Sequence, residues 1–254
     1  MSLVKRSPIS NMLPYFYSSS LADGSTLELD NDTSHHVAQV LRMEKGEALN
    51  LTDGCGQLIE GKLIAVSKKS CTVAVEKRTQ QDASGRLVHL AIAPVKNSSR
   101  FEWFIEKATE LGVRSITPIR TSRTEKDRLR IDRLRQVSIS AMLQSQQVWL
   151  PEIGAPTPYA SLIQQWQQAS MQRLIAHCRD ANRMPIASLS VSDVVGLLIG
   201  PEGDFTPDEI ALAAAAGFQE VQLGATRLRT ETAGVVGATW LRLQKSGSII
   251  AWAG

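Results

Sequence analysis

Short apolar or alternating runs mark the first third of the chain. They lie between residues 26 and 78 and are separated by turn-forming residues, among them Asp53-Gly54. One short helical pattern near Ser34–Arg42 interrupts them. Several short strands at close spacing predict a small β-barrel. The expected strands are Thr26–Leu29, Ala48–Leu51, Leu58–Val66 and Cys71–Val75.

Residues 79–86 are polar and carry neither the period of a strand nor that of a helix. A chain of 254 residues is long enough for two modest domains. We therefore expect a boundary in this segment, with one domain over residues 1–80 and a second over residues 81–254.

Beyond this boundary, apolar runs of strand length alternate with segments of helical spacing. This alternation predicts an α/β fold, in which helices cover both faces of a parallel sheet. The expected strands are Leu87–Ala93, Ser115–Ile119, Arg173–His177, Val194–Ile199 and Glu220–Leu223, and the expected helices lie near residues 101–111, 127–147, 207–216 and 230–245, with one more after Pro158.

Capping signals predict where several of these helices begin and end. A Ser or Thr followed three residues later by Glu satisfies two unpaired N–H groups, and proline is favoured at the first helical position. Glycine is favoured just past a helix end, where Gly112 stands. The boxes are Ser99 with Glu102 and Thr206 with Glu209, and the prolines are Pro158 after Thr157 and Pro207 after Thr206.

Composition limits the function classes only mildly. The chain is 43% hydrophobic with a net charge of +3, which is ordinary for a globular protein and too small by itself to indicate nucleic-acid binding. Positive charge is clustered, because residues 120–135 hold seven Lys or Arg against three Asp or Glu. This cluster is typical either of a nucleic-acid surface or of a solvated helix face with i,i+4 ion pairs.

The cysteines and the longest apolar runs point to a cytoplasmic protein. Cys55, Cys71 and Cys178 are isolated and show no metal-ligand spacing, so no metal site is expected. Sparse, unpaired cysteine suits a reducing compartment. No apolar run approaches the roughly 20 residues of a membrane span, and Lys5 and Arg6 precede no apolar signal region.

Two loops stand at expected strand ends, where parallel sheets bind their ligands. The first is Gly200-Pro-Glu-Gly-Asp-Phe205, which follows the expected strand Val194–Ile199. Its glycines and proline form a rigid loop that exposes main-chain groups. The second runs from Leu223-Gly224 through Arg227-Leu-Arg-Thr-Glu-Thr232. The chain has no Walker motif and no G-x-G-x-x-G, which argues against P-loop and dinucleotide-binding domains. An ordinary tight βα turn remains the alternative for the first loop.

The expected helix after the second loop is rich in small residues, including Gly234 and Gly237. Glycine inside a helix costs about 1 kcal/mol relative to alanine, so its presence needs a physical reason. Close approach of a cofactor or of another backbone is one reason. Tight packing inside the domain and a subunit interface are the alternatives.

With these residues the chain resembles the SPOUT superfamily, and within it the bacterial small-subunit ribosomal RNA uridine N3-methyltransferases of the RsmE type. The resemblance rests on five ordered motifs that span nearly the whole chain. They are His36-Val-Ala-Gln-Val-Leu-Arg-Met43, Arg100–Val113, Gln144-Ser145 with Leu150–Ile153, Leu198–Gly203, and Leu223-Gly-Ala-Thr-Arg-Leu-Arg-Thr-Glu-Thr-Ala233.

The resemblance implies a PUA-like N-terminal barrel that docks RNA, and an α/β domain with a C-terminal trefoil knot. It implies a homodimer that methylates N3 of a uridine in 16S ribosomal RNA, free or in the small subunit. It also implies S-adenosylmethionine as the methyl donor, held bent in the knot. The expected cofactor-binding residues are His177, Ile199, Gly200, Glu202, Gly203, Leu223, Gly224 and Leu228.

Chemistry at uridine N3 requires the loss of a proton, which calls for a base or for a cation that stabilises the anion. Arg229, beside the cofactor loop, is the first candidate for the cation, and Glu231 is a candidate base. A helix-cap or ion-pair role for Glu231, and a satisfied core position for His177, are the alternatives. Arg42, Arg123 and Arg128 are the candidate RNA contacts, because phosphate contacts dominate affinity.

Four positions depart from the family pattern. They are Tyr15, Ser122, Leu143 and Gln147, and each removes a charge from a possible RNA or catalytic surface. The departures leave the cofactor loops intact, but they leave the target nucleotide open. Methylation of another RNA and a non-catalytic RNA-binding assembly factor remain the alternative functions.

Overall fold

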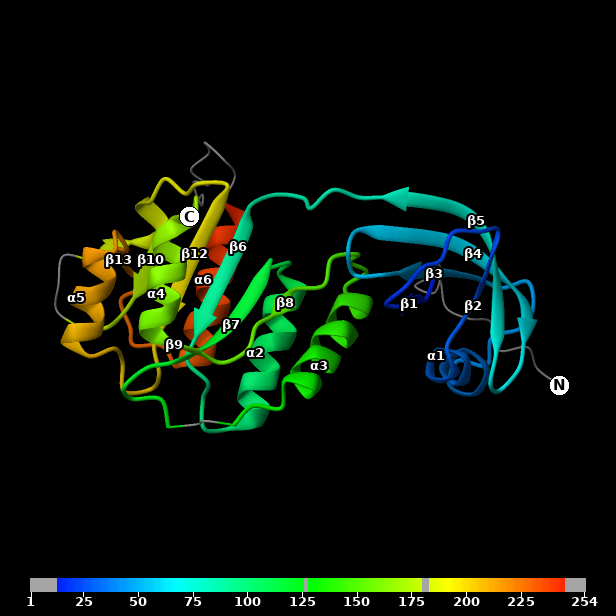
Figure 1. Cartoon of the computed structure of the whole chain (residues 1–254), viewed down its shortest axis with the longest axis horizontal. Helices are drawn as coiled ribbons and strands as arrows, with labels where there is room; N and C mark the ends of the chain where they lie inside the picture. Colours follow the sequence, from blue (N-terminus) through cyan, green and yellow to red (C-terminus); the bar gives the residue numbers. More distant parts are fainter. Residues whose placement is uncertain (1–12, 126–127, 180–182, 245–254) are drawn as a thin grey trace. The chain divides into compact units, whose positions relative to one another are not determined.

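The computed structural model describes residues 13–125, 128–179 and 183–244. Within them the chain forms two compact units (Figure 1). Unit 1 comprises Met1–Asp82 together with Leu143–Trp149, and unit 2 comprises Ala83–Met142 together with Leu150–Gly254. Lys126, which belongs to the positive cluster noted in the sequence, lies outside the described residues.

Unit 1 contains a five-stranded sheet in the order β1-β3-β4-β5-β2. Its core is formed by buried residues that include Leu49, Leu51, Ile59, Leu63 and Val73. The strands are β1 (Tyr15–Tyr17), β2 (Thr26–Glu28), β3 (Ala48–Thr52), β4 (Gln57–Val66) and β5 (Cys71–Gln80). All pairs are antiparallel except β1 with β3, and β1 was not expected from the sequence.

The helical segment of unit 1 begins earlier than its pattern predicts. Helix α1 (Asn31–His35) starts after Asp30, whose carboxylate accepts the backbone N–H of Thr33 at 2.7 Å. The chain then widens into a π-helix, η1 (His36–Val40). Val37 is fully buried in the barrel core, and this contact orients the helical segment.

The short segment Leu143–Trp149 belongs to unit 1 although it is distant in sequence. The Gly56 N–H donates to the Val148 carbonyl at 2.8 Å, and Cys55 forms a β-bridge with Trp149. The Trp149 indole also donates to the Gln81 carbonyl at 3.2 Å. The periodicity of the sequence carries no sign of this long-range pairing.

Unit 2 is built on a parallel sheet in the order β11-β13-β10-β12-β6-β7-β8, and β9 pairs with β7. Strand β12 lies between β6 and β10, which brings segments distant in sequence side by side. The strands are β6 (Leu87–Ile92), β7 (Ser115–Arg120), β8 (Glu152–Ile153), β9 (Thr157–Pro158), β10 (Gln172–Ala176), β11 (Met184–Pro185), β12 (Val194–Ile199) and β13 (Gln219–Gln222).

Helices cover both faces of this sheet (Figure 1). Alternate residues of one strand point to opposite faces, so Leu90 and Ala91 of β6 enter different core clusters. Helices α2 (Ser98–Glu110), α3 (Ile131–Gln144) and α6 (Thr230–Leu243) contribute to the first cluster, and α4 (Tyr159–Gln168) and α5 (Pro207–Ala215) to the second. A short 3₁₀ helix spans Ile186–Ser188.

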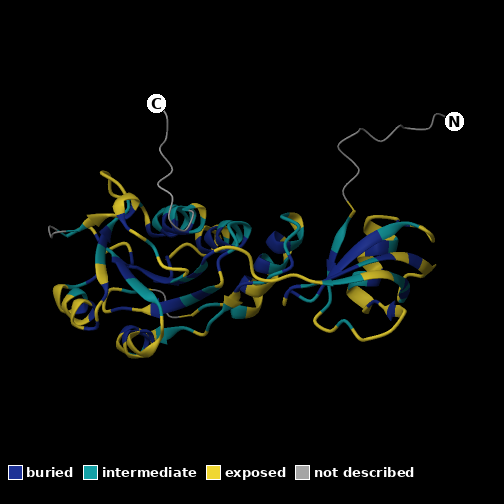
Figure 2. Cartoon of the chain, turned by 90° about the horizontal axis from the view of Figure 1, so that it is seen from above, coloured by how far each residue is buried: buried dark blue, intermediate teal, exposed yellow. Residues whose placement is uncertain are grey.

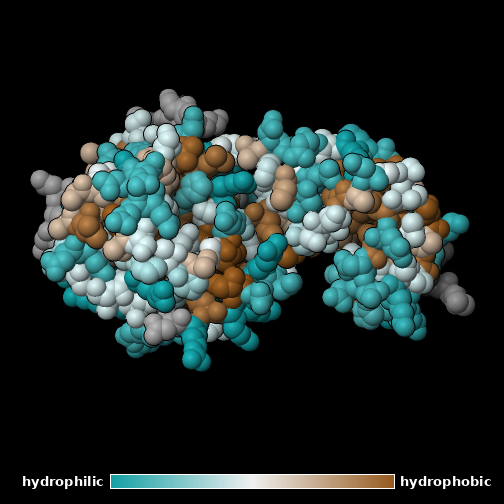
Figure 3. Space-filling model, viewed as in Figure 1, coloured by the Kyte–Doolittle hydropathy of each residue, from teal (hydrophilic) through white to brown (hydrophobic). Residues whose placement is uncertain are grey.

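The burial pattern follows from this layering. The central strands are buried, and each helix exposes its outer face (Figure 2). On the face seen in Figure 3, hydrophilic residues cover most of each unit, and hydrophobic residues form separate patches. The predicted α/β fold of the second domain is confirmed, as is the strand-rich character of the first.

One of the two predicted capping boxes, that of α5, is confirmed. The predicted caps of α2 and α4 are wrong. Thr206 and Glu209 form a reciprocal capping box on α5. Helix α2 is instead capped by Asn97, whose side-chain oxygen accepts the N–H groups of Ser99 and Arg100 at 2.9 and 3.4 Å. Thr157 does not cap α4, because its backbone pairs with β7 as part of β9.

The glycines of α6 are required by packing within unit 2. A Cβ on Gly234 would lie 2.5 Å from Cε2 of Phe104, and one on Gly237 would lie 2.4 Å from Cδ2 of Leu197. Both distances are far below normal contact. The structure therefore favours tight internal packing over cofactor contact as the reason for these two glycines.

Buried Arg86 holds the C-terminal end of the same helix. Its Nη1 donates to the Leu241 and Gln244 carbonyls, each at 2.7 Å, and its other nitrogens donate to Val191 and Ser192. Only 4% of Arg86 is exposed. A buried guanidinium requires such partners, and here it satisfies carbonyls that a helix end leaves unpaired.

We expect Gly234→Ala to destabilise the protein by about 1–3 kcal/mol, because the added methyl group overpacks the contact between α6 and Phe104. The midpoint of urea unfolding measures this change. Gly224→Ala is the matched control, since its Cβ would meet nothing within 4 Å. An unchanged midpoint for Gly234→Ala would show that α2 and α6 are not closely packed.

Candidate active site

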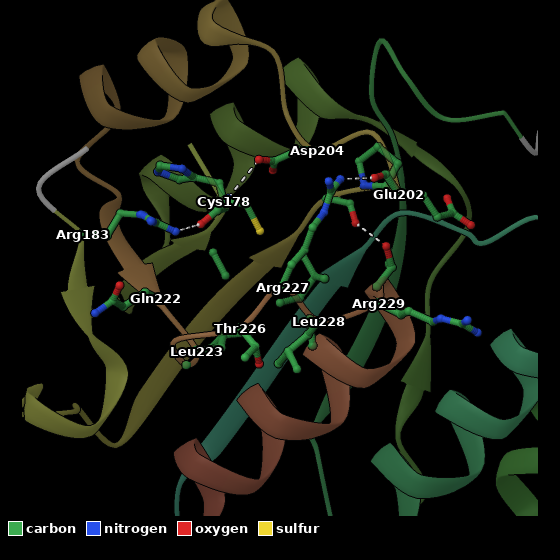
Figure 4. A pocket seen from close by; sticks show the side chains of 18 of the residues that line it. Cys178, Arg183, Glu202, Asp204, Gln222, Leu223, Thr226, Arg227, Leu228 and Arg229 are labelled. Atoms are coloured by element: carbon green, nitrogen blue, oxygen red, sulfur yellow. Dashed lines mark hydrogen bonds between the residues drawn. The ribbon is translucent and has the colours of Figure 1, made fainter. Parts of the chain in front are cut away.

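A pocket of about 600 Å³ opens in unit 2 at the carboxyl ends of β10, β12 and β13 (Figure 4). These three strands are neighbours only because β12 inserts beside β10 and β13 pairs with the other edge of β10. The first turn of α6 closes the pocket with Thr230 and Ala233. The volume lies in the range of small-molecule sites, and its position is the one expected for a parallel sheet.

The loop after β12 is held by side chains that bind its carbonyl groups. Buried Thr230 donates its hydroxyl to the Gly200 carbonyl at 3.0 Å. Arg227 donates to the Glu202 carbonyl at 2.8 Å, and Arg123 donates to the Gly203 carbonyl at 2.6 Å. The N–H of Asp204 closes a turn on the Pro201 carbonyl at 2.9 Å. These hydrogen bonds to its carbonyl groups define the shape of the loop.

Glycine occurs in the two loops for different physical reasons. A Cβ on Gly200 would lie 3.1 Å from the ring of buried Phe205, so packing restricts this position. A Cβ on Gly224 would meet no atom within 4 Å, and the backbone there does not adopt the left-handed conformation. Neither packing nor conformation accounts for Gly224, which lines the pocket.

His177 directly follows β10. It is both a buried residue with a polar partner and a residue of the pocket lining, which are the two alternatives that the sequence left open. Its side chain is buried, and Nε2 lies 2.8 Å from a carboxylate oxygen of Glu220. The residue also lines the pocket, and its Nδ1 has no partner among the described residues. Its backbone carbonyl accepts a hydrogen bond of 2.6 Å from Arg183.

Most of the predicted cofactor-binding residues meet at this pocket. The exception is Gly203, which is not part of the lining and instead contacts Arg123. The predicted residues that line it are His177, Ile199, Gly200, Glu202, Leu223, Gly224 and Leu228. Sequence reasoning missed Cys178, Arg183 and Gln222, whose places depend on strand order. Asp204 and Thr226 also line the pocket and lie within the two expected loops, although neither was a predicted cofactor-binding residue.

The two candidate catalytic residues have different environments. Arg229 is the N-cap residue of α6, is exposed, lines the pocket, and points away from Leu228 and Thr226 in Figure 4. Glu231 is 6% exposed and lies outside the pocket lining, with its carboxylate 3.8 Å from the Arg100 guanidinium. This placement favours the ion-pair role for Glu231.

The three candidate RNA contacts are dispersed. Arg123 binds the loop after β12, so part of its role is structural. Arg128 is exposed and lines a small depression with residues of α2 and α3, including Phe101 and Arg133. Arg42 is exposed in unit 1 and follows Leu41, the C-cap residue of η1.

The described residues contain no group of three or more His, Cys, Asp or Glu side chains that could hold a metal ion. They also contain no helix that is long and apolar enough to cross a membrane.

Both units match models of known protein families. Residues 83–242 match the model of an RNA methyltransferase domain, and residues 29–76 match that of an RNA methyltransferase PUA domain. Ribosomal RNA small subunit methyltransferase E of Synechocystis is 32% identical, over 84% of this chain and 71% of its own length.

Solved structures agree with this match. A probable rRNA methyltransferase from Porphyromonas gingivalis superimposes with a TM-score of 0.83 at 37% identity, covering 90% of this chain and 96% of its own. Ribosomal RNA small subunit methyltransferase E of Neisseria gonorrhoeae, solved with bound S-adenosylmethionine, gives a TM-score of 0.80 at 28% identity, covering 89% and 95%. This chain therefore belongs to the RNA methyltransferase family whose curated members include ribosomal RNA small subunit methyltransferase E.

Proposed function

We propose that this protein transfers a methyl group from S-adenosylmethionine to N3 of a uridine in 16S ribosomal RNA. The observation that carries the proposal is the pocket at the ends of β10, β12 and β13. It combines a loop held by hydrogen bonds, Gly224 with no protein atom within 4 Å of a Cβ at that position, and an exposed arginine at the start of α6. The solved relative with this cofactor supports the choice of donor.

The residues of the pocket fit the parts of S-adenosylmethionine. Leu223, Leu228 and Ala233 offer apolar surface for the flat adenine, and Gly224 leaves room for close approach. The cofactor carries an ammonium group, a carboxylate and a positive sulfur. Acidic Glu202 and Asp204 and basic Arg183 line the same pocket, so groups of both signs have partners there. The unpartnered Nδ1 of His177 supplies a further polar group.

The bound cofactor would supply an electrophilic methyl group that needs no metal. The protein then has to hold the reacting nitrogen in line with that methyl, which is catalysis by proximity and orientation. It also has to favour loss of the N3 proton. Arg229 remains charged at neutral pH, so it stabilises the uridine anion rather than accepting the proton. The positive end of the α6 dipole acts in the same direction.

Glu231 is the weaker catalytic candidate. A base has to reach the proton that it abstracts, directly or through one water. Glu231 is buried and near Arg100 instead of lining the pocket. We therefore assign it to holding α2 and α6 together at the start of α6.

Several finer features belong to the same proposal. Arg128 and Arg123 would contact RNA phosphates, and the protein would act in the cytoplasm. We also propose a homodimer. Its support is a set of apolar residues on α6, namely half-exposed Val236 and Trp240 and Leu243, which is 59% exposed.

The C-terminal trefoil knot and the division into domains 1–80 and 81–254 stay predictions.

The direct test of the function is mass mapping of methylated nucleotides in 16S ribosomal RNA. RNA from a deletion strain should lack one methylated uridine, and incubation of its small subunits with the protein and S-adenosylmethionine should restore it. A gain of methyl groups only on another RNA, or no cofactor binding at all, would contradict the proposal.

Gly224→Ala should weaken S-adenosylmethionine binding about tenfold or more, because its methyl group would project into space that the ligand needs. Isothermal titration calorimetry measures the affinity. The unfolding midpoint should not fall, since the methyl group meets no protein atom within 4 Å. Wild-type affinity in this variant would mean that the cofactor does not approach Gly224.

Arg229→Ala should lower the single-turnover methylation rate about 100-fold or more, which is typical for loss of one group that stabilises an anion. Cofactor affinity should stay within about threefold of wild type. Arg229→Lys keeps the charge and should retain more of the rate. A near-normal rate for Arg229→Ala with bound cofactor would remove Arg229 from the mechanism.

A further inference from the structure

A buried nitrogen in the wall of the pocket has no hydrogen-bond partner in the described part of the chain. It is Nδ1 of His177, whose side chain is 0% exposed. A buried polar atom that stays unpaired costs about 1–3 kcal/mol, so each such atom in a folded protein needs an explanation. Because His177 lines the pocket, a group of the bound ligand is the natural partner of Nδ1.

The other ring nitrogen of His177 is held by Glu220 from the neighbouring strand. Strand β13 pairs with β10, and Ile175 stands opposite Glu220 in their register. A carboxylate oxygen of Glu220 lies 2.8 Å from Nε2 of His177. A carboxylate can only accept a hydrogen bond, so Nε2 carries a proton and donates it. In a neutral imidazole the second nitrogen, Nδ1, then presents a lone pair and acts as an acceptor.

Glu220 reaches the ligand only through this contact. Its side chain is 28% exposed, and the residue is not part of the pocket lining. Among the described residues, its carboxylate has no hydrogen bond or ion pair other than the one with His177. The carboxylate therefore satisfies no other group of the fold, and its effect on a ligand has to pass through the imidazole.

The backbone that carries the ring is fixed by two further contacts. Arg183 donates to the His177 carbonyl at 2.6 Å (Figure 4), and Asp204 accepts the Cys178 N–H at 2.9 Å. Arg183 also lines the pocket, and a guanidinium can only donate hydrogen bonds. A neutral Nδ1 therefore gives the same wall an acceptor, so that the wall distinguishes donor groups of a ligand from acceptor groups.

We propose that Glu220 is a positioning residue that keeps the proton of His177 on Nε2, so that Nδ1 accepts a hydrogen bond from the adenosine part of the cofactor. The identity of the cofactor rests on the proposed function. Adenosine has donors in its adenine amine and its ribose hydroxyls. The ammonium group is the other donor of S-adenosylmethionine, and Glu202 and Asp204 offer carboxylates to it. A proton on Nδ1 would leave two donors facing each other.

The position of the ring proton can be measured by two-bond ¹H–¹⁵N NMR spectra of the imidazole rings, in the full-length protein at about pH 8. The chain has four histidines, and the ring signals that are absent from His177→Asn belong to His177. The wild-type protein should show the tautomer with its proton on Nε2. Glu220→Gln should show a mixture of both tautomers, because an amide can accept from Nε2–H or donate to a bare Nε2.

Glu220→Lys should reverse the contact, because an ammonium group can only donate and Nε2 then has to accept, which moves the ring proton to Nδ1. The affinities for S-adenosylmethionine and for adenosine should each fall about tenfold or more, since the hydrogen bond to a buried group is lost. Glu220→Gln should lower both about twofold, because only the tautomer with a bare Nδ1 binds. Isothermal titration calorimetry measures both ligands.

Two controls separate this effect from a general loss of negative charge. Glu152→Lys makes the same charge change at an exposed position of β8, at the other end of the sheet order, and should keep near wild-type affinity for both ligands. His177→Asn removes the imidazole, so adding Glu220→Lys to it should not lower adenosine affinity any further.

A wild-type His177 with its proton on Nδ1, or with both nitrogens protonated, would overturn the proposal, as would unchanged adenosine affinity in Glu220→Lys. An equal loss of affinity with and without the imidazole would also overturn it, because Glu220 would then act without the ring. Cofactor binding that depends on Glu220, but without methyl transfer to 16S ribosomal RNA, would contradict the proposed function and support the role of Glu220.

Discussion

The close docking of α6 on β6, β12 and α2 is the constraint on which the candidate site depends. Gly234 and Gly237 let the helix approach Phe104 and Leu197 more closely than any side chain would allow. Its ends are held as well, by Thr230 on the Gly200 carbonyl and by Arg86 on the last carbonyls. The segment 223–229 therefore enters α6 from a determined position, and one wall of the pocket follows from this packing.

The remaining walls come from loops that hydrogen bonds within unit 2 hold in shape. Arg123 and Arg227 bind successive carbonyl groups of the loop after β12, and Asp204 accepts the Cys178 N–H at 2.9 Å from the neighbouring strand end. Such contacts reduce the conformational freedom of the loops and so the cost of ordering them around a ligand. Arg123, a candidate RNA contact from the sequence, thus also has a structural role in holding this loop.

Local signals identified the elements better than their boundaries. Apolar runs located every long strand of unit 2, and β12 has the predicted bounds of Val194–Ile199. The start of α2 was wrong because Asn97, Ser98 and Ser99 are all competent caps, and only the exit from β6 selects Asn97. The two-residue strands β8, β9 and β11 exist through pairing with longer neighbours, so they have no period of their own.

The sequence by itself determined the α/β class, the barrel, the two ligand loops and the family, because each depends on local burial period or on short ordered motifs. The tertiary structure decided which strand ends meet. Insertion of β12 between β6 and β10 brings Ile199 and Gly200 beside His177, and the pairing of β13 with β10 adds Gly224. Glu231 is buried near Arg100 in the first turn of α6 and does not line the pocket. The period of apolar residues indicates that a residue is buried, but it does not indicate which residues it contacts. Those contacts depend on packing between segments that are distant in the chain.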